Sequence, residues 1–212
     1  MDVQLPSIAP MLAAAYAPCP AFSGACSSMR WAPSEGHVPR GFCGANGDPK
    51  QVKLVLVVAE PGDPHQLESH PASPPMATLE STHGYAYRCF RDGKDLFHRN
   101  VRRILDLCLP GMTFDEQMQV AFITESVLCS AKSEGAAVPT VVARECRKRH
   151  IDHQLDAFPN ATIIALGKKA AKRLAGRSGV ITAFAAAPPG CNFAGAEDSW
   201  RTAAKEVHDR AV

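Results

Sequence analysis

The chain has 212 residues, of which 46% are hydrophobic and 21% are charged, a composition typical of one folded globular domain. No apolar run approaches the roughly 20 residues that cross a bilayer, which excludes a membrane span, and the first residues lack the basic stretch of a secretory signal. Basic residues exceed acidic ones by only 23 to 21, so net charge neither requires nor excludes a polyanionic partner. We expect a cytoplasmic protein whose single domain spans residues 1–212.

Residues 1–50 differ in composition from the rest of the chain. Residues 5–16 are predicted to form a short helix with Pro6 near its start. Residues 18–49 are rich in proline, glycine and serine and contain Cys19, Cys26 and Cys43. Loops of about 30 residues are uncommon in compact domains unless something fixes them. A metal cluster bound by these cysteines would do so.

In residues 51–212, strands and helices alternate. Residues 52–58 form a continuous apolar, β-branched run, typical of a strand buried on both faces. Three further runs are predicted to be strands, at 120–124, 161–166 and 180–184. Four segments have helical spacing, at 95–109, 139–158, 168–175 and 198–211. This alternation predicts an α/β fold, a three-layer α/β/α sandwich with a central four-stranded parallel sheet.

Ligands of such sheets bind beyond the carboxyl ends of the strands. The loops there, with nearby segments, carry a resemblance to a known family. In chain order, the matching segments are residues 56–63 (LVVAEPGD), 97–105, 122–129 (FITESVLC), Cys146 and 163–171 (IIALGKKAA). As an ordered set spanning residues 19–190, they resemble the iron–sulfur branch of the uracil-DNA glycosylase superfamily. The resemblance implies that superfamily's fold, a [4Fe–4S] cluster and hydrolysis of the N-glycosidic bond of a flipped, deaminated base. It also implies a monomer that binds damaged or single-stranded DNA.

The resemblance also implies roles for single residues. Glu60 occupies the position of an acidic residue that assists hydrolysis in the family. Asp63 echoes an Asp-Pro turn in another branch of the superfamily, although it could merely cap a turn. Phe97 matches a phenylalanine that stacks on the flipped base, although its spacing also fits the apolar face of a helix.

Two positions depart from the family pattern. Glu125 stands where the family has an asparagine that reads the uracil edge. A glutamate can accept a hydrogen bond from a base N–H, but it repels a carbonyl oxygen unless it is protonated. After the last strand the family has His-Pro-Ser, whereas this chain has Ala187-Pro188-Pro189. Pro188 matches the proline and is expected in the substrate site. Ala187 replaces the histidine that stabilises the leaving base in the family.

An iron–sulfur cluster takes four thiolate ligands. Cys129 and Cys146 have nearly the separation of one pair of cysteines in the family. For the other pair we favour Cys19 and Cys26, although six residues separate them where the family commonly has two; Cys43 is the alternative ligand. The cysteines could instead bind zinc or be unrelated buried thiols, and their spacing leaves these readings open.

Basic residues could bind the phosphates of DNA. Lys168 and Lys169 follow Gly167 at the start of a predicted helix, and helix amino termini bind phosphate. Other basic clusters lie at residues 94–103 and 144–149, where a solvated helix face explains them equally well.

Three hypotheses follow. The first is an iron–sulfur DNA glycosylase. The second is a superfamily member that has lost catalysis and binds only nucleic acid or a base-like ligand, which Glu125 and Ala187 favour. The third is a generic α/β hydrolase in which the cysteines only pack.

Overall fold

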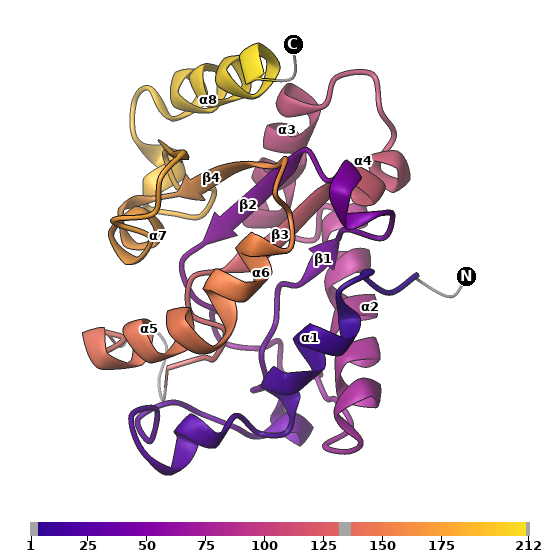
Figure 1. The fold of residues 1–212 in the computed structure, drawn as a ribbon, viewed down its shortest axis with the longest axis vertical. Helices are drawn as coiled ribbons and strands as arrows, with labels where there is room; N and C mark the ends of the chain where they lie inside the picture. The colour runs from indigo at the N-terminus through magenta and orange to yellow at the C-terminus, as the bar shows by residue number, and fades with distance from the viewer. Residues whose placement is uncertain (1–3, 132–136, 211–212) are drawn as a thin grey trace.

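Five strands form one sheet in the order β1-β3-β2-β4-β5 (Figure 1). The structure is a computed structural model that describes residues 4–131 and 137–210. The strands are β1 (Cys43–Gly44), β2 (Leu54–Val58), β3 (Ala121–Glu125), β4 (Thr162–Leu166) and β5 (Val180–Ala183). The predicted four-stranded parallel sheet is confirmed for β2 to β5. The short strand β1, which was not predicted, pairs antiparallel with β3 and makes the whole sheet mixed.

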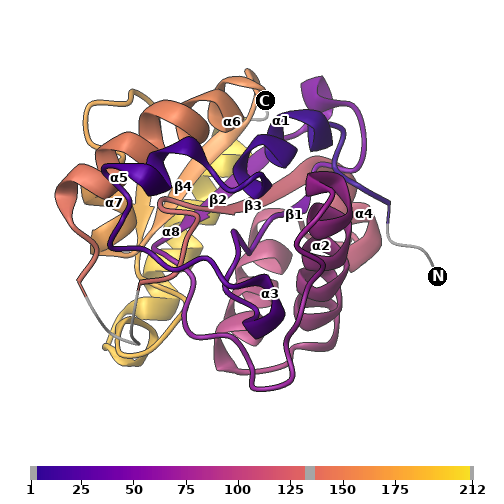
Figure 2. The same cartoon turned by 90° about the horizontal axis from the view of Figure 1, so that it is seen from below.

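The sheet separates two apolar cores because successive strand residues point to opposite faces. Val55 and Val57 belong to one core, and Leu54 and Leu56 belong to the other. Helices α1 (Ala9–Ala13), α5 (Thr140–Cys146), α6 (Asp152–Asp156) and α7 (Lys168–Arg173) contribute to the first core. Helices α3 (Leu96–Cys108), α4 (Phe114–Val120) and α8 (Ala196–Arg210) contribute to the second. Figure 2 shows the sheet between α5 and α6 on one side and α3 and α8 on the other, which is an α/β sandwich.

The predicted helices are present with adjusted limits. Helix α3 begins after Asp95, whose carboxylate accepts from the His98 backbone N–H at 3.0 Å. The helix predicted at 139–158 consists of α5, a π-helical turn (Arg147–Ile151) and α6. The helix predicted at 198–211 is α8, and residue 211 lies outside the described residues. The helix predicted at 5–16 is the single turn α1 followed by a 3₁₀ turn at Ala14–Tyr16.

Helices α2 (Pro75–Asp92) and α4 were not predicted. Helix α2 lies at the edge of the sandwich and contributes Leu79 to one core and Phe90 to the other. Polar Thr82 and His83 are also buried on it. The buried face of α2 therefore lacks the continuous apolar pattern by which a helix is recognised in a sequence.

The amino-terminal segment is held against the loop that follows β3. Met29 forms an isolated β-bridge with Ala131, and the Arg30 backbone N–H donates to the Ser130 carbonyl at 3.1 Å. This contact brings the part of the chain with the first cysteines beside Cys129. In the part of the chain that the structure describes, no helix is both long and apolar enough to cross a membrane.

The strand order creates a switch point beside β2. The chain leaves β2 for β3 on one side and later returns to β4 on the other side. The loops that leave the carboxyl ends of β2 and β4 therefore diverge, and such points are where open α/β sheets bind ligands. Glu60 follows β2, and Lys168 and Lys169 follow β4.

Candidate functional site

Four cysteines from three regions of the chain line one small cavity of about 20 Å³. They are Cys19, Cys26, Cys129 and Cys146, the four predicted ligands. Most of the other lining side chains are apolar, among them Met29, Val127, Leu128 and Val142. The fold therefore brings together the four thiols that the sequence predicted to share one site.

Each thiol is placed by a different local structure. Cys19 precedes a 3₁₀ turn (Pro20–Ser23), and Cys26 follows it in the same loop. Cys129 lies four residues after the end of β3, and Cys146 is the last residue of α5. The Leu128 backbone N–H donates to the Cys146 Sγ at 3.4 Å.

The acid–base behaviour of the thiols reflects their burial and closeness. Burial raises the pKa of Cys129 well above its ordinary value, and the neighbouring thiolates of Cys146, Cys19 and Cys26 raise it further. Burial likewise raises the pKa of Cys146 to about 12. The pKa of Cys26 is also raised, first by burial and then by Cys19. Four thiolates would repel one another in this cavity, so a positive metal group would stabilise their deprotonated form.

Four thiolates are the donor set that a [4Fe–4S] cluster takes, with one thiolate for each iron. Within residues 4–131 and 137–210, no three His, Cys, Asp or Glu side chains already converge as ligands of one metal ion. In a [4Fe–4S] cluster each thiolate binds a different iron, so the sulfurs stand further apart than around one tetrahedral zinc. Soft thiolates lining one apolar cavity are the donors that such a cluster requires.

Cys43, the alternative ligand, lies elsewhere. It is fully buried on β1 in the core on the other side of the sheet, with its Sγ 3.5 Å from the Met118 Sδ. Cys108 is packed in that same core on α3. Neither side chain lines the cavity of the four cysteines.

Glu60 is held in two ion pairs just after β2. Its carboxylate accepts from the Lys169 Nζ and from the Arg173 guanidinium, each at 2.5 Å. Glu60 and Arg173 are each 12% exposed at the side chain, whereas Lys169 is 61% exposed. Arg173 also donates to the Ala59 carbonyl at 2.9 Å and to the Ser126 Oγ at 3.1 Å. The switch point is therefore a compact charged site built from the ends of β2, β3 and β4.

Glu125 ends β3 directly beside this site, paired in the sheet with Val58. Burial raises its pKa well above the ordinary value; the charges of Arg40 and Arg173 oppose this shift, and that of Glu60 adds to it. Its Oε2 is buried and has no hydrogen-bond partner among the described residues. A Cβ at Gly41 would lie 2.7 Å from its Oε1, so only glycine fits there. Burial therefore favours the protonated, neutral form of Glu125.

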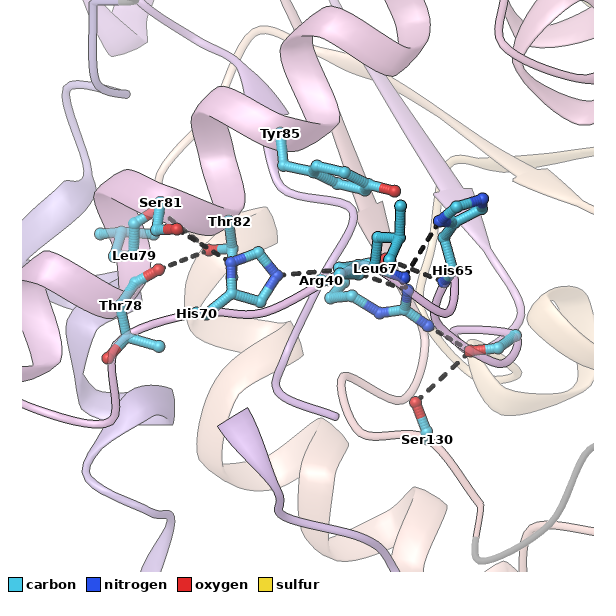
Figure 3. A network of polar contacts seen from close by, with 12 residues as sticks. Arg40, His65, Leu67, His70, Thr78, Leu79, Ser81, Thr82, Tyr85 and Ser130 are labelled. Carbon is cyan, nitrogen blue, oxygen red and sulfur yellow. Dashed lines mark hydrogen bonds and ion pairs between the residues drawn. The ribbon is translucent and has the colours of Figure 1, made fainter. Parts of the chain in front are cut away.

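The loop that carries Asp63 is fixed by a buried polar network (Figure 3). Arg40 donates to the Gly62 carbonyl and to both oxygens of Glu68, at 3.2 and 3.0 Å. His70 joins Glu68 to Ser81, with ring nitrogens 3.1 and 2.9 Å from their oxygens.

This network governs both the charge of Glu68 and the position of the loop. Burial alone would raise the pKa of Glu68. The hydrogen bond from His70 and the charge of Arg40 outweigh burial and hold that pKa below its ordinary value. Asp63 itself is exposed. The network thus fixes the backbone of the loop and leaves the Asp63 side chain at the surface.

The two remaining predicted substrate residues are Phe97, on α3, and Pro188, in the loop after β5. Phe97 opens α3 half-buried, with its ring centroid 5.9 Å from that of Phe90 and 5.1 Å from that of His98. One turn later, the Asn100 amide donates to the Ala186 carbonyl at 2.8 Å, two residues before the exposed Pro188. No contact among the described residues joins Phe97 to Glu60, and the Phe97 ring packs as part of the second core.

Sequence reasoning missed the inward-facing cations. In the sequence, Arg173 is one of four basic residues in α7, and nothing singles out Arg40. A glutamate that is shielded from water needs a cationic partner, which would have pointed to these arginines. The sequence does not reveal that Glu60 or Glu68 is shielded in this way. Lys168 is exposed, and Lys169, predicted to bind DNA, pairs with Glu60.

No protein-family model matches this chain, and no curated protein sequence is significantly similar to it. The family resemblance therefore depends on the ordered motifs and on the geometry of the cysteines and the switch point.

Proposed function

We propose that this protein is an iron–sulfur DNA glycosylase of the uracil-DNA glycosylase type. The observation that carries the proposal is the shared cavity of Cys19, Cys26, Cys129 and Cys146. They are the same four residues that the sequence motifs predict as ligands. Unrelated buried cysteines would have no reason to converge from separate regions of the chain, so their convergence supports both the cluster and the resemblance.

The four thiolates would hold a [4Fe–4S] cluster that, when bound, cross-links the amino-terminal segment to α5 and to the loop after β3. That loop also supports the charged site. The Ser126 Oγ donates to the Ala59 carbonyl at 2.6 Å, and the Ser130 Oγ donates to the Gly62 carbonyl at 3.5 Å. The segment that binds the cluster therefore holds both ends of the loop that carries Glu60.

The chemistry we propose takes place on a base flipped out of DNA. Glu60 would stabilise the positive charge that develops on the sugar as the base leaves and would orient the attacking water. Lys169 is exposed enough to move from Glu60 to a phosphate of the bound DNA, which would free one oxygen of the carboxylate. Phe97 would stack on the base from α3, which lies on the opposite face of the sheet from α7.

Glu125 would read the edge of the base. A neutral carboxyl group has one donor and one acceptor, as the amide of the family's asparagine does. Its burial therefore removes the repulsion that an ionised glutamate would exert on a base carbonyl. The same pair of groups can face the N–H and C=O edge of uracil, hypoxanthine or xanthine.

The second candidate function is binding of nucleic acid without catalysis. Both oxygens of Glu60 are engaged by cations, and Ala187 supplies no group to stabilise a leaving base. In this case the charged site would contact a phosphate or a base and leave the glycosidic bond intact.

One series of measurements tests the proposal. Anaerobically purified protein should absorb visible light and contain about four iron and four sulfide per chain. Colourless protein that takes up no iron on anaerobic reconstitution would refute the cluster. Loaded protein is then incubated with oligonucleotides containing uracil, hypoxanthine or xanthine, and abasic sites are cleaved. Strand scission that is lost in Glu60→Gln and kept in Glu80→Gln, an exposed carboxylate on α2, supports the enzyme. Binding without scission supports the second candidate.

A further inference from the structure

A hollow of about 350 Å³ lies between the end of α2 and the outer face of α3, apart from the site described above. Four arginines dominate its lining, with two aspartates, one glycine and one leucine: Arg91, Arg99, Arg102, Arg103, Asp92, Asp106, Gly93 and Leu107. A hollow of this size can hold a small ligand. Its charged groups decide which ligand it favours.

Two of the arginines are neutralised by carboxylates. Arg91 pairs with Asp92 at 2.8 Å, and Arg103 pairs with Glu197 of α8 at 2.6 Å. Asp106 accepts from the Gln117 amide at 2.9 Å. These contacts neutralise Asp92 and Glu197, whereas Asp106 is bonded to a neutral amide and keeps its negative charge.

Arg99 and Arg102 have no carboxylate partner within ion-pair distance among the described residues. Arg102 is nevertheless oriented, because its Nη1 donates to the Arg91 carbonyl at 3.0 Å and its guanidinium lies 4.5 Å from the centroid of the Phe114 ring. Its Nε is buried and has no hydrogen-bond partner within residues 4–131 and 137–210. Arg99 donates to the Gly93 carbonyl at 3.3 Å. Each guanidinium thus keeps unused donors, and the two unpaired arginines outweigh the one unpaired aspartate, Asp106, so the hollow keeps a net positive charge.

We propose that this hollow binds a phosphate group through Arg99 and Arg102. Guanidinium groups bind phosphate through paired N–H donors in a planar fork, and an arginine already fixed by stacking loses little freedom on binding. The phosphate can come from the backbone of a nucleic acid or from a small phosphorylated molecule. Only the nucleic-acid source rests on the proposed function.

The test uses the full-length protein and inorganic pyrophosphate, titrated by calorimetry. Arg99→Gln and Arg102→Gln should each weaken pyrophosphate binding about tenfold, the loss expected for one charge-assisted hydrogen-bonding group. The matched control is Arg201→Gln, an exposed arginine of α8 that pairs with Glu197 outside the hollow. Arg102→Gln loses the stacking on Phe114 and could be destabilised for that reason. Arg99 is exposed and makes one weak contact, so Arg99→Gln remains informative in that case.

A parallel titration with a single-stranded oligonucleotide distinguishes the two sources. If the nucleic-acid backbone is the ligand, Arg99→Gln should also weaken oligonucleotide binding. The slope of log affinity against log salt concentration should then fall by about the contribution of one phosphate contact. If only pyrophosphate binding is weakened, the site serves a small phosphorylated ligand. Wild-type protein that fails to bind pyrophosphate, or binding that is equal in wild type and Arg99→Gln, overturns the proposal and leaves the glycosylase proposal unaffected.

Discussion

Arg173 on α7 and Glu60 after β2 form an ion pair in which each side chain is only 12% exposed. The same guanidinium nitrogen reaches the Ser126 hydroxyl and the Ala59 carbonyl. A single side chain therefore links the ends of three parallel strands. Because the pair is largely shielded from water, removing one partner should cost more than at a surface pair, since the other charge is left poorly solvated.

Replacing Arg173 tests this contribution. Arg173→Met should lower the free energy of unfolding by about 1–3 kcal/mol, since it leaves the Glu60 carboxylate paired only with the mobile Lys169. Adding Glu60→Gln should then cost less than the sum of the two single changes, because the variants share one interaction. Urea unfolding of the four proteins measures this coupling. The exposed control Arg201→Met should change stability by less than about 1 kcal/mol, and strict additivity at Glu60 and Arg173 would show that the pair is not coupled.

Arg40 leads to a second stability prediction. Arg40→Gln should destabilise the protein by about 2–4 kcal/mol, because it leaves Glu68 buried with only His70 and backbone partners and also frees the Gly62 carbonyl. Ser130→Ala removes only the long contact to Gly62 and should cost less than about 1 kcal/mol. The two variants are compared by urea unfolding. Equal costs would mean that Arg40 does not hold the loop through Glu68.

These charged contacts mark the limit of what the sequence predicts. The strands could be predicted because a run such as residues 52–58 is apolar at almost every position, as burial on both faces requires. The convergence of the four cysteines could be predicted from motifs. The sequence does not show which basic residue of α7, Lys168, Lys169, Lys172 or Arg173, faces Glu60. That depends on where α7 begins and on how it lies relative to β2.

The missing elements have a similar cause. Strand β1 has only two residues, too few to establish an alternating pattern. Helix α2 buries Thr82 and His83 in place of apolar residues; the Thr82 hydroxyl lies 2.9 Å from the Tyr16 hydroxyl. Such tertiary hydrogen bonds make polar residues suitable for a core, but a single sequence does not reveal the partner.

His83 should make stability depend on acid. It is buried, neither ring nitrogen has a hydrogen-bond partner among the residues that the structure describes, and burial lowers its pKa to about 4 from the ordinary 6.5. Between these values the unfolded chain binds a proton that the folded protein does not. The free energy of unfolding therefore falls as the pH drops from 6.5 to 4. His83→Gln should reduce this fall by up to about 3 kcal/mol, measured by urea unfolding across that range. Parallel pH profiles in the two proteins would contradict the prediction.

Glu125 should act in the opposite direction. Because burial raises its pKa, the folded protein keeps a proton that the unfolded chain releases above about pH 4.5. Wild type should therefore lose stability relative to Glu125→Gln as the pH rises from 4.5 toward the raised value. At neutral pH the glutamine variant should be at least as stable as wild type. Thermal unfolding at several pH values measures this difference. A glutamine variant that becomes less stable than wild type as the pH rises would indicate an ionised glutamate with a favourable partner.

The cysteine set gives the sharpest prediction. Alanine at Cys19, Cys26, Cys129 or Cys146 should each remove one thiolate and reduce the iron bound per folded chain to less than about half. Cys43→Ala and Cys108→Ala are matched controls, because both thiols are buried in the other core and should leave the iron content unchanged. Iron and sulfide are measured on the monomer peak of anaerobic gel filtration, so that misfolded protein is not counted. Loss of iron in Cys43→Ala, with full loading of Cys19→Ala or Cys26→Ala, would reassign the amino-terminal ligands.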